Sequence, residues 1–311
     1  MDRPGGQARS GRHAAASWAR RSGRPETMSL DERKAPSPVA AVSELESDRA
    51  LIEFYTDRFD ESTRLARPDG RLEFMRTQEL LRSVLPPAPA RVLDVGGATG
   101  VHAAWLAQDG YEVELIDIVP AHVERARELA RTLPRGFAAT LGDARSLAQE
   151  DASCDACLLL GPLYHLVRPE DRARALSEAV RVTRSQGVVV AAAISRFAWP
   201  LDSLRHRDEF PERMAAMRAV IETGLHDRER GFTTAYMHRP SELSAELEAA
   251  GLLDVSVLGV EGPAWVLLYP EIPEPQAANL LRSAVHAARL CEGDPDMVAV
   301  SCHMLARGRT A

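Results

Sequence analysis

The feature that most constrains this chain is a glycine-rich turn at residues 96–100, directly after a short apolar stretch at 91–95. A helix is expected immediately afterwards, over residues 101–109. Glycine lets a backbone turn sharply and come close to a ligand. In an open parallel sheet, ligands lie beyond the carboxyl ends of the strands. This strand, turn and helix therefore predict an α/β fold with a ligand site at the turn.

Strand and helix patterns alternate along the rest of the chain. Apolar strands are expected at 91–95, 112–116, 137–141, 156–160, 187–194, 252–260 and 297–306. Helices are expected between them at 101–109, 121–132, 172–182, 241–251 and 277–291. Strands that alternate with helices form parallel sheets through right-handed crossovers. Such strands are buried on both faces, so they should be apolar throughout, as these are.

Three segments fall outside this alternation. Residues 1–40 are rich in Arg, Gly, Ala and Ser and are expected to be a disordered leader. Residues 41–90 carry two helical patterns, expected to form a lid ahead of the domain at 91–311. The stretch at about 197–235 is mostly helical and highly charged, which suits a cap inserted into that domain.

Acidic residues stand at regular places along the predicted strands. Asp94 lies inside the first strand, Asp117 ends the second about 20 residues after the glycine turn, and Asp143 follows the third. A dinucleotide-binding G-x-G-x-x-G pattern that begins at Gly96 would need glycines where Ala98 and Val101 stand. The acids and the turn together therefore favour a nucleoside ligand that carries an amino group, and disfavour a dinucleotide.

The bulk composition narrows the possible partners and compartment. The net charge is −7, which argues against nucleic acid as a partner. No apolar run approaches the roughly 20 residues of a membrane-spanning helix, so no membrane is expected. Cys154 and Cys157 form a lone C-x-x-C within an apolar strand, where small buried side chains are expected instead of a metal or redox site. Reduced thiols favour the cytoplasm.

The segment from about residue 45 onwards resembles the bacterial class I S-adenosylmethionine (SAM)-dependent methyltransferases. The resemblance rests on the glycine turn at 92–100, on the run at 158–166 and on the helix at 71–74. It implies a seven-stranded sheet in the order 3-2-1-4-5-7-6 with the last strand antiparallel. It also implies that Gly96, Ala98 and Gly100 wrap the methionine part of SAM, with Asp117 at the ribose and Asp143 at the adenine.

The expected cofactor contacts follow the ends of these strands and the lid. They are Tyr55, Asp94, Gly96, Gly97, Ala98, Gly100, Asp117, Ile118, Gly142, Asp143, Ala144, Leu160 and His165. A base helps methyl transfer when the nucleophile carries a proton. His165 and Tyr164 follow the fourth strand and are candidates, as is His238, expected at the mouth of the site. Trp265 could wall the acceptor pocket or simply pack.

The sequence thus predicts transfer of a methyl group from SAM to an O, N or C atom of a small metabolite, by a monomer or homodimer with no metal. Three alternatives stay open. They are a methyltransferase acting on RNA or protein, an NAD-dependent oxidoreductase, and a SAM-binding regulator without chemistry. The first would need an open, basic cleft.

Overall fold

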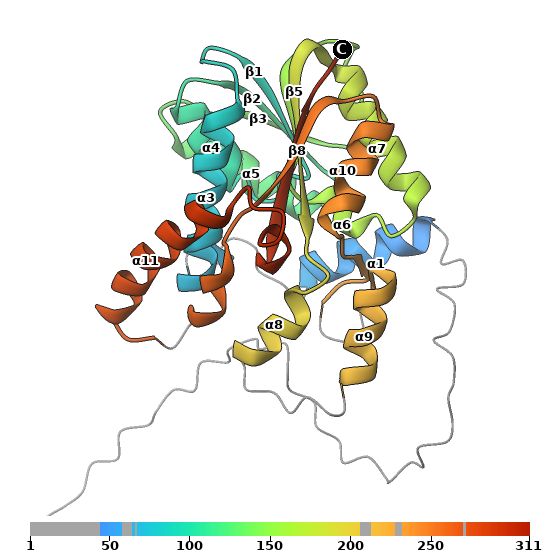
Figure 1. Cartoon of the computed structure of the whole chain (residues 1–311). Coiled ribbons are helices and arrows are strands. Elements are labelled where there is room, and N and C mark those ends of the chain that lie inside the picture. Colours follow the sequence, from blue (N-terminus) through green and yellow to red (C-terminus); the bar gives the residue numbers. More distant parts are fainter. Residues whose placement is uncertain (1–43, 58–63, 66, 206–212, 228–231, 270–271) are drawn as a thin grey trace, which may run out of the picture.

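The computed structural model describes residues 44–57, 64–65, 67–205, 213–227, 232–269 and 272–311. The leader expected at residues 1–40 lies outside the described residues, as do His206 and Asp208 of the expected cap. Figure 1 shows the strands of the main sheet running together through the centre of the molecule, with helices on both sides.

Seven strands form the central sheet, in the order β3-β2-β1-β4-β5-β9-β8. Strands β1 to β5 are parallel, and β9 runs antiparallel to both β5 and β8. Because β6 and β7 form a separate hairpin, β8 and β9 are the sixth and seventh strands of this sheet, and the expected order is confirmed. The bounds are Arg91–Val95 (β1), Glu112–Asp117 (β2), Ala138–Leu141 (β3), Cys154–Leu159 (β4), Thr183–Ile194 (β5), Leu253–Gly259 (β8) and His303–Arg309 (β9).

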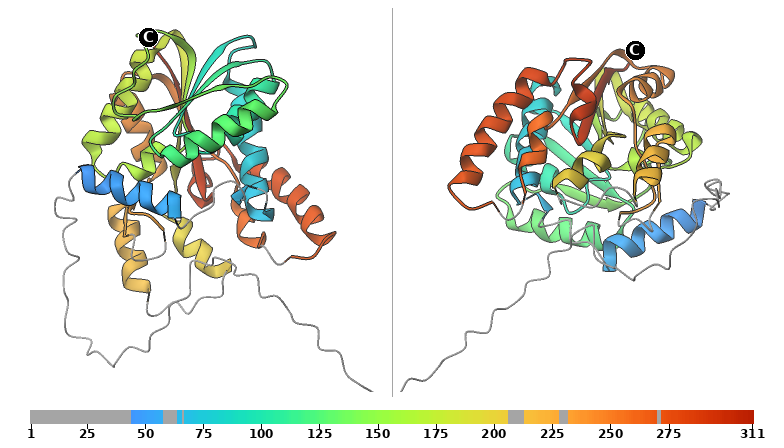
Figure 2. Two further views of the ribbon diagram at one scale, coloured as in Figure 1. Left: turned by 180° about the vertical axis from the view of Figure 1, so that it is seen from behind. Right: turned by 60° about the horizontal axis from the view of Figure 1, so that its bottom comes forward.

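Helices cover the sheet on both faces, as a sheet without a polar face requires. On one face lie α3 (Pro68–Val84), α4 (Val101–Gln108) and α5 (Pro120–Thr132), and on the other α7 (Pro169–Val182) and α10 (Pro240–Ala249). The two views in Figure 2 show these layers from behind and from below. Each face has its own apolar core, and Leu158 and Leu159 of β4 point into opposite ones.

The carboxyl edge of the parallel strands carries the elements that do not belong to the alternation. In Figure 1 this edge lies at the bottom, where α1, α6, α8 and α9 gather. Their bounds are Glu44–Asp57 (α1), Pro162–His165 (α6), Ala198–Arg205 (α8) and Met214–Thr223 (α9). The expected cap is therefore helical in part, but it also contains an unexpected hairpin of β6 (Leu225–His226) and β7 (Ala235–Tyr236).

The C-terminal part differs from the expectation in one place. The strand expected at 297–306 begins only at His303, because Val298–Val300 form a short 3-10 helix (η3) that turns the chain into β9. A short apolar run cannot be assigned to helix or strand by its periodicity alone. Before it, α11 (Gln276–Cys291) packs against α3 and against η2 (Pro263–Leu267), where Trp265 is buried.

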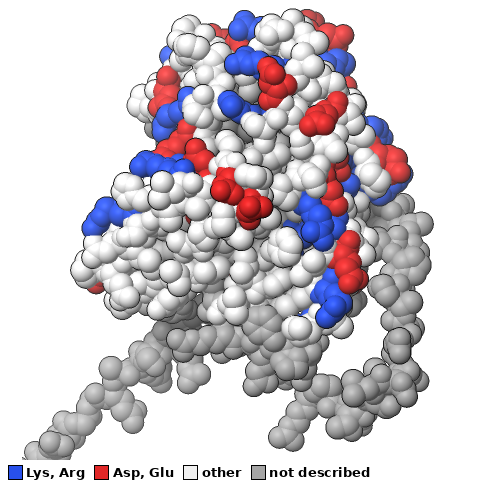
Figure 3. All heavy atoms as spheres, viewed as in Figure 1, with Lys and Arg blue, Asp and Glu red and all other residues white. Residues whose placement is uncertain are grey.

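Two surface properties bear on the expected partners. Within the described ranges, no helix is long and apolar enough to span a membrane. On the face drawn in Figure 3, Arg side chains lie interspersed with Asp and Glu, and no continuous basic stretch crosses that face. Cys154 and Cys157 are free and buried in β4, in agreement with the structural role expected for them.

Candidate active site

The glycine turn follows β1 and leads into α4. Gly96 has φ +71°, and a Cβ there would lie 2.6 Å from Cδ of Pro162, the first residue of α6. Gly100 has φ +88° and precedes α4, where a Cβ would lie 2.6 Å from the Phe137 ring. Both positions combine a left-handed backbone with a close approach that only glycine allows. The turn thus brings the ends of β1 and β4 together.

Ala98 departs from the glycine common in the resembling family, and it too has a left-handed backbone (φ +49°). Its amide donates a hydrogen bond of 2.8 Å to Oδ2 of Asp117 at the end of β2. The other oxygen of Asp117 accepts the Val119 amide at 2.8 Å. These contacts hold the Asp117 carboxylate against the turn, and His122 Nδ1 lies 3.3 Å from it. Ile118 beside it is half-buried.

Asp94 of β1, just before the turn, has an unusual environment for an ionisable side chain. Its side chain is completely buried, and neither carboxylate oxygen accepts a hydrogen bond from the described residues. Burial and the nearby Asp117 charge raise the pKa of Asp94 to about 7, against a smaller opposing effect of the Ala103 amide. Its Oδ2 lies 2.7 Å from where a Cβ of Gly97 would be. A buried carboxylate without a partner beside such a turn fits the ammonium group of a methionine tail.

Asp143 stands after β3, at the same edge. Its carboxylate accepts hydrogen bonds from Nε and the amide of Arg145, at 3.0 and 2.8 Å. Arg145 also pairs with Asp48 of the lid helix α1 at 2.5 Å, so the lid is tied to the expected adenine position. Gly142 and Ala144, the other residues predicted here, are the chain neighbours of Asp143. Sequence reasoning missed Arg145, because Asp48 lies 97 residues away and no motif links the two.

His165 is the meeting point of three segments. One ring nitrogen lies 3.0 Å from the Tyr55 hydroxyl of α1, and the other lies 3.0 Å from Oγ1 of Thr233 in the cap. Burial lowers the pKa of His165 to about 3, so the ring is neutral at pH 7. A neutral imidazole donates one hydrogen bond and accepts one. Both nitrogens are therefore engaged in this arrangement, and His165 joins lid and cap.

Aromatic side chains surround this junction. The ring centroids of Tyr164 and His165 are 4.6 Å apart, and those of Tyr55 and His122 are 5.2 Å apart. Phe232 of the cap, which sequence reasoning missed, lies 5.8 Å from His165. Leu160 follows β4 and packs on the core. The structure thus brings the side chains of Tyr55, Tyr164 and His165 together.

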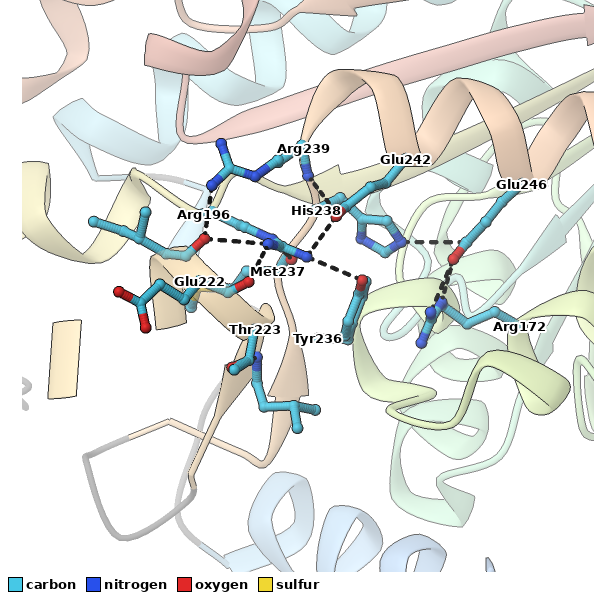
Figure 4. A network of polar contacts seen from close by, with 12 residues as sticks. Arg172, Arg196, Glu222, Thr223, Tyr236, Met237, His238, Arg239, Glu242 and Glu246 are labelled. Atoms are coloured by element: carbon cyan, nitrogen blue, oxygen red, sulfur yellow. Dashed lines mark hydrogen bonds and ion pairs between the residues drawn. The ribbon is translucent and has the colours of Figure 1, made fainter. Parts of the chain in front are cut away.

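His238 lies elsewhere than expected. Its side chain is fully buried instead of standing at the mouth of the site, and its Nε2 lies 3.2 Å from Glu246 of α10. Figure 4 shows it inside a polar network with Arg172 and Arg196. Its backbone pairs with that of Ser195, directly after β5, and this bridge fixes His238 in the interior. Trp265 also packs, and its indole N–H donates to the Val300 carbonyl.

Comparison with known proteins agrees with this geometry. Residues 92–187 match the family model described as a methyltransferase domain. The chain is 28% identical over 167 residues to a glycine/sarcosine N-methyltransferase of Parasynechococcus marenigrum, covering 53% of this chain and 58% of that protein. It is 37% identical over 109 residues to an uncharacterised methyltransferase of Mycobacterium bovis, covering 35% of this chain and 42% of that protein. The chain thus spans about half the length of these curated relatives.

The fold has counterparts among solved structures. A SAM-dependent methyltransferase of Thermotoga maritima, named as a "possible histamine N-methyltransferase", aligns with a TM-score of 0.55 at 16% identity. The alignment covers 85% of this chain and 100% of that one, and at this identity it shows the fold alone. The sheet order is that of the class I SAM-dependent methyltransferase fold, and residues 92–187 match a methyltransferase domain. Both findings agree with the resemblance that the sequence indicates and with SAM as the cofactor that it implies.

Proposed function

We propose that this protein is an enzyme that transfers the methyl group of SAM to a nucleophilic atom of a small molecule. The observation that carries the proposal is the buried, unpartnered carboxylate of Asp94 beside the glycine turn. An isolated buried charge is costly and is kept where a ligand supplies its partner. The ammonium group of the methionine tail is such a partner.

The acids at the ends of β2 and β3 would bind the remaining parts of SAM. Asp117, held by two backbone amides, would receive the ribose hydroxyls. Asp143 would face the adenine, with Arg145 linking it to the lid. SAM supplies a methyl group on a positively charged sulfur. What the protein adds is alignment and exclusion of water, which by itself can lower the barrier by several kcal/mol.

The arrangement at the carboxyl edge supports a small acceptor. Lid helix α1 and the cap converge on His165 through Tyr55 and Thr233, so both cover the edge where the turn lies. Covered clefts suit small molecules better than folded macromolecules. One relative is named as an N-methyltransferase of glycine and sarcosine, which supports a small amine among the possible acceptors.

Calorimetric titration with SAM and with its demethylated product, S-adenosylhomocysteine (SAH), tests the proposal. We expect micromolar affinity for the wild type, and loss of binding in Asp117→Ala. Asp151→Ala is the matched control, because this side chain is 79% exposed and far along the chain from the turn. If folded wild-type protein binds neither ligand, the proposal fails, and nicotinamide cofactors should be titrated next.

A further inference from the structure

Several buried polar atoms around the glycine turn have no hydrogen bond within the described part of the chain. Besides both carboxylate oxygens of Asp94, they include Oγ1 of Thr99 and both ring nitrogens of His122. Native proteins satisfy nearly all of their buried polar groups, so each exception needs an explanation. A ligand that enters this edge of the sheet accounts for all three residues, and His122 is the bulkiest of them without an assigned task.

His122 lies in the first turn of α5, a few residues after the end of β2. Its amide donates to the Val119 carbonyl at 3.0 Å, which starts the helix, and its side chain is 3% exposed. Nδ1 of the ring lies 3.3 Å from Oδ1 of Asp117, with an alignment too poor for a hydrogen bond. The imidazole therefore stands directly beside the carboxylate that is expected to bind the ribose.

Tyr55 of the lid helix α1 also contacts this imidazole. The centroids of the two rings are 5.2 Å apart, and the ring planes are inclined at 64°. The Tyr55 hydroxyl lies 3.0 Å from Nε2 of His165, so its interaction with His122 is a contact between ring surfaces. His122 is thus enclosed between Asp117 and the lid, in a place that bulk water hardly reaches.

Packing alone does not explain a histidine at this position. Burial of a polar group without a hydrogen bond is unfavourable, because the group loses its contacts with water and gains none in return. An apolar side chain of similar size would fill the same space without that cost. A buried imidazole beside Asp117 is therefore better explained by a ligand that completes its hydrogen bonds than by the stability of α5.

The two hydroxyls of a ribose match what Asp117 and His122 offer together. A carboxylate only accepts hydrogen bonds, at about four lone-pair sites. The amides of Ala98 and Val119 occupy one site on each Asp117 oxygen, both at 2.8 Å, so each oxygen can still accept one hydroxyl proton. The hydroxyl oxygens then need a donor. An imidazole carries at least one N–H whether it is neutral or charged, and it supplies that donor.

We propose that His122 is a second ribose-binding residue, which donates a hydrogen bond to one ribose hydroxyl of SAM while Asp117 accepts the hydroxyl protons. This inference rests on the proposed methyltransferase function and concerns the same site. It makes the enzyme selective for a complete ribose, since a cofactor without that hydroxyl leaves the buried imidazole without its partner. It also places the ribose contact directly against Tyr55 of the lid.

Calorimetry on the full-length protein tests this inference with SAH and with 2′-deoxy-SAH and 3′-deoxy-SAH, which each lack one ribose hydroxyl. Each analogue should bind the wild type about tenfold more weakly than SAH, because it loses a buried hydrogen bond. His122→Met removes the ring nitrogens but keeps an apolar side chain of similar length. It should weaken SAH about tenfold. It should also leave the Kd of one analogue within about twofold of the wild-type value, because that analogue lacks the hydroxyl that His122 binds.

Further variants separate hydrogen bonding from packing. His122→Asn and His122→Gln place an amide N–H near the positions of Nδ1 and Nε2, and at least one of them should bind SAH within about threefold of the wild type. His286→Leu is the matched control, because it replaces an exposed histidine of α11, and it should leave the Kd of SAH unchanged. Ligand-free His122→Met should unfold at or above the wild-type temperature, since it loses no hydrogen bond of the ring to any described residue.

Two results would overturn the inference. One is SAH binding by His122→Met as tight as that of the wild type. The other is an equal loss for SAH and both analogues, which would mean that His122 only packs or contacts another part of the cofactor, such as the adenine. His122→Leu takes the place of His122→Met if that variant does not fold. Wild-type protein that binds no SAH would instead refute the methyltransferase function, so the two failures are distinguishable.

Discussion

At the scale of single residues, the site contains ionisable groups that the protein keeps at a cost. Asp94 is buried without a hydrogen bond, and burial together with Asp117 raises its pKa from 3.8 to about 7. A carboxyl group with a raised pKa binds its proton more tightly in the folded chain than in the unfolded one. Its contribution to stability is therefore complete below pH 4 and is lost as the pH rises through about 7.

Asp94→Asn should separate stability from cofactor binding. The amide carries no charge, so the variant should be about 1–2 kcal/mol more stable than the wild type at pH 8 without cofactor, and closer to it at pH 5. Its affinity for SAM should fall at least tenfold. Urea unfolding at both pH values and calorimetry measure these effects. A variant that is less stable at pH 8, or that binds SAM normally, would contradict this assignment.

At the scale of elements, the glycine turn joins two strands sterically. Gly96 lies against Pro162, so the turn after β1 and the start of α6 after β4 fit only without a side chain at this position. Gly251, in contrast, follows α10 with φ +90°, and a Cβ added there would meet no atom within 4 Å. The two glycines share a left-handed backbone but differ in the space around them.

Substitution of each glycine by alanine should separate the cost of the left-handed backbone from the cost of a side-chain clash. Gly251→Ala should cost about 1 kcal/mol of unfolding free energy, because only the left-handed backbone is strained. Gly96→Ala adds the collision with Pro162 and should cost about 2–4 kcal/mol. Only Gly96→Ala should also weaken SAM binding. Equal losses in urea unfolding for both variants would show that the contact with Pro162 has no energetic importance.

At the scale of the whole molecule, the cap is joined to the sheet by a buried polar network (Figure 4). Arg196 follows β5 and is 4% exposed. Its guanidinium donates to the carbonyls of Met237 and Glu222 at 3.1 and 2.9 Å and pairs with Glu242 of α10 at 2.6 Å. A further hydrogen bond runs to the Tyr236 hydroxyl at 3.1 Å, so one side chain connects the sheet edge with α9, β7 and α10.

Removal of this link should loosen the cap as a unit. Arg196→Met leaves Oε1 of Glu242 and the carbonyls of Met237 and Glu222 without this donor and should cost about 3–5 kcal/mol. Arg307→Met is the control. Among the described residues the exposed Arg307 side chain donates only to Ser256, and its loss should change stability by less than about 0.5 kcal/mol. Thermal unfolding and hydrogen exchange in 213–227 measure the difference. Unchanged exchange in that segment would show that other contacts hold the cap.

Local patterns predicted most of the fold and the places of three acids at the carboxyl edge of the sheet. The parallel strands and their helices could be predicted because buried strands are apolar throughout and each strand begins or ends near a turn. Asp94, Asp117 and Asp143 could be singled out because each acid lies inside its own strand, at the end of it or just after it. The partners of His165, the Arg145–Asp48 pair and the Glu261–His303 pair could not be predicted, since their members lie far apart along the chain.

The sequence by itself therefore determined the class of fold, the glycine turn and the order of the acids, because these depend on neighbours within one strand, turn or helix. The tertiary structure alone decided that His238 is buried against Glu246, that Thr233 and Tyr55 share His165, and that Glu261 meets His303. The physical reason is that burial and charge pairing depend on distances in space, which packing of the sheet, lid and cap sets.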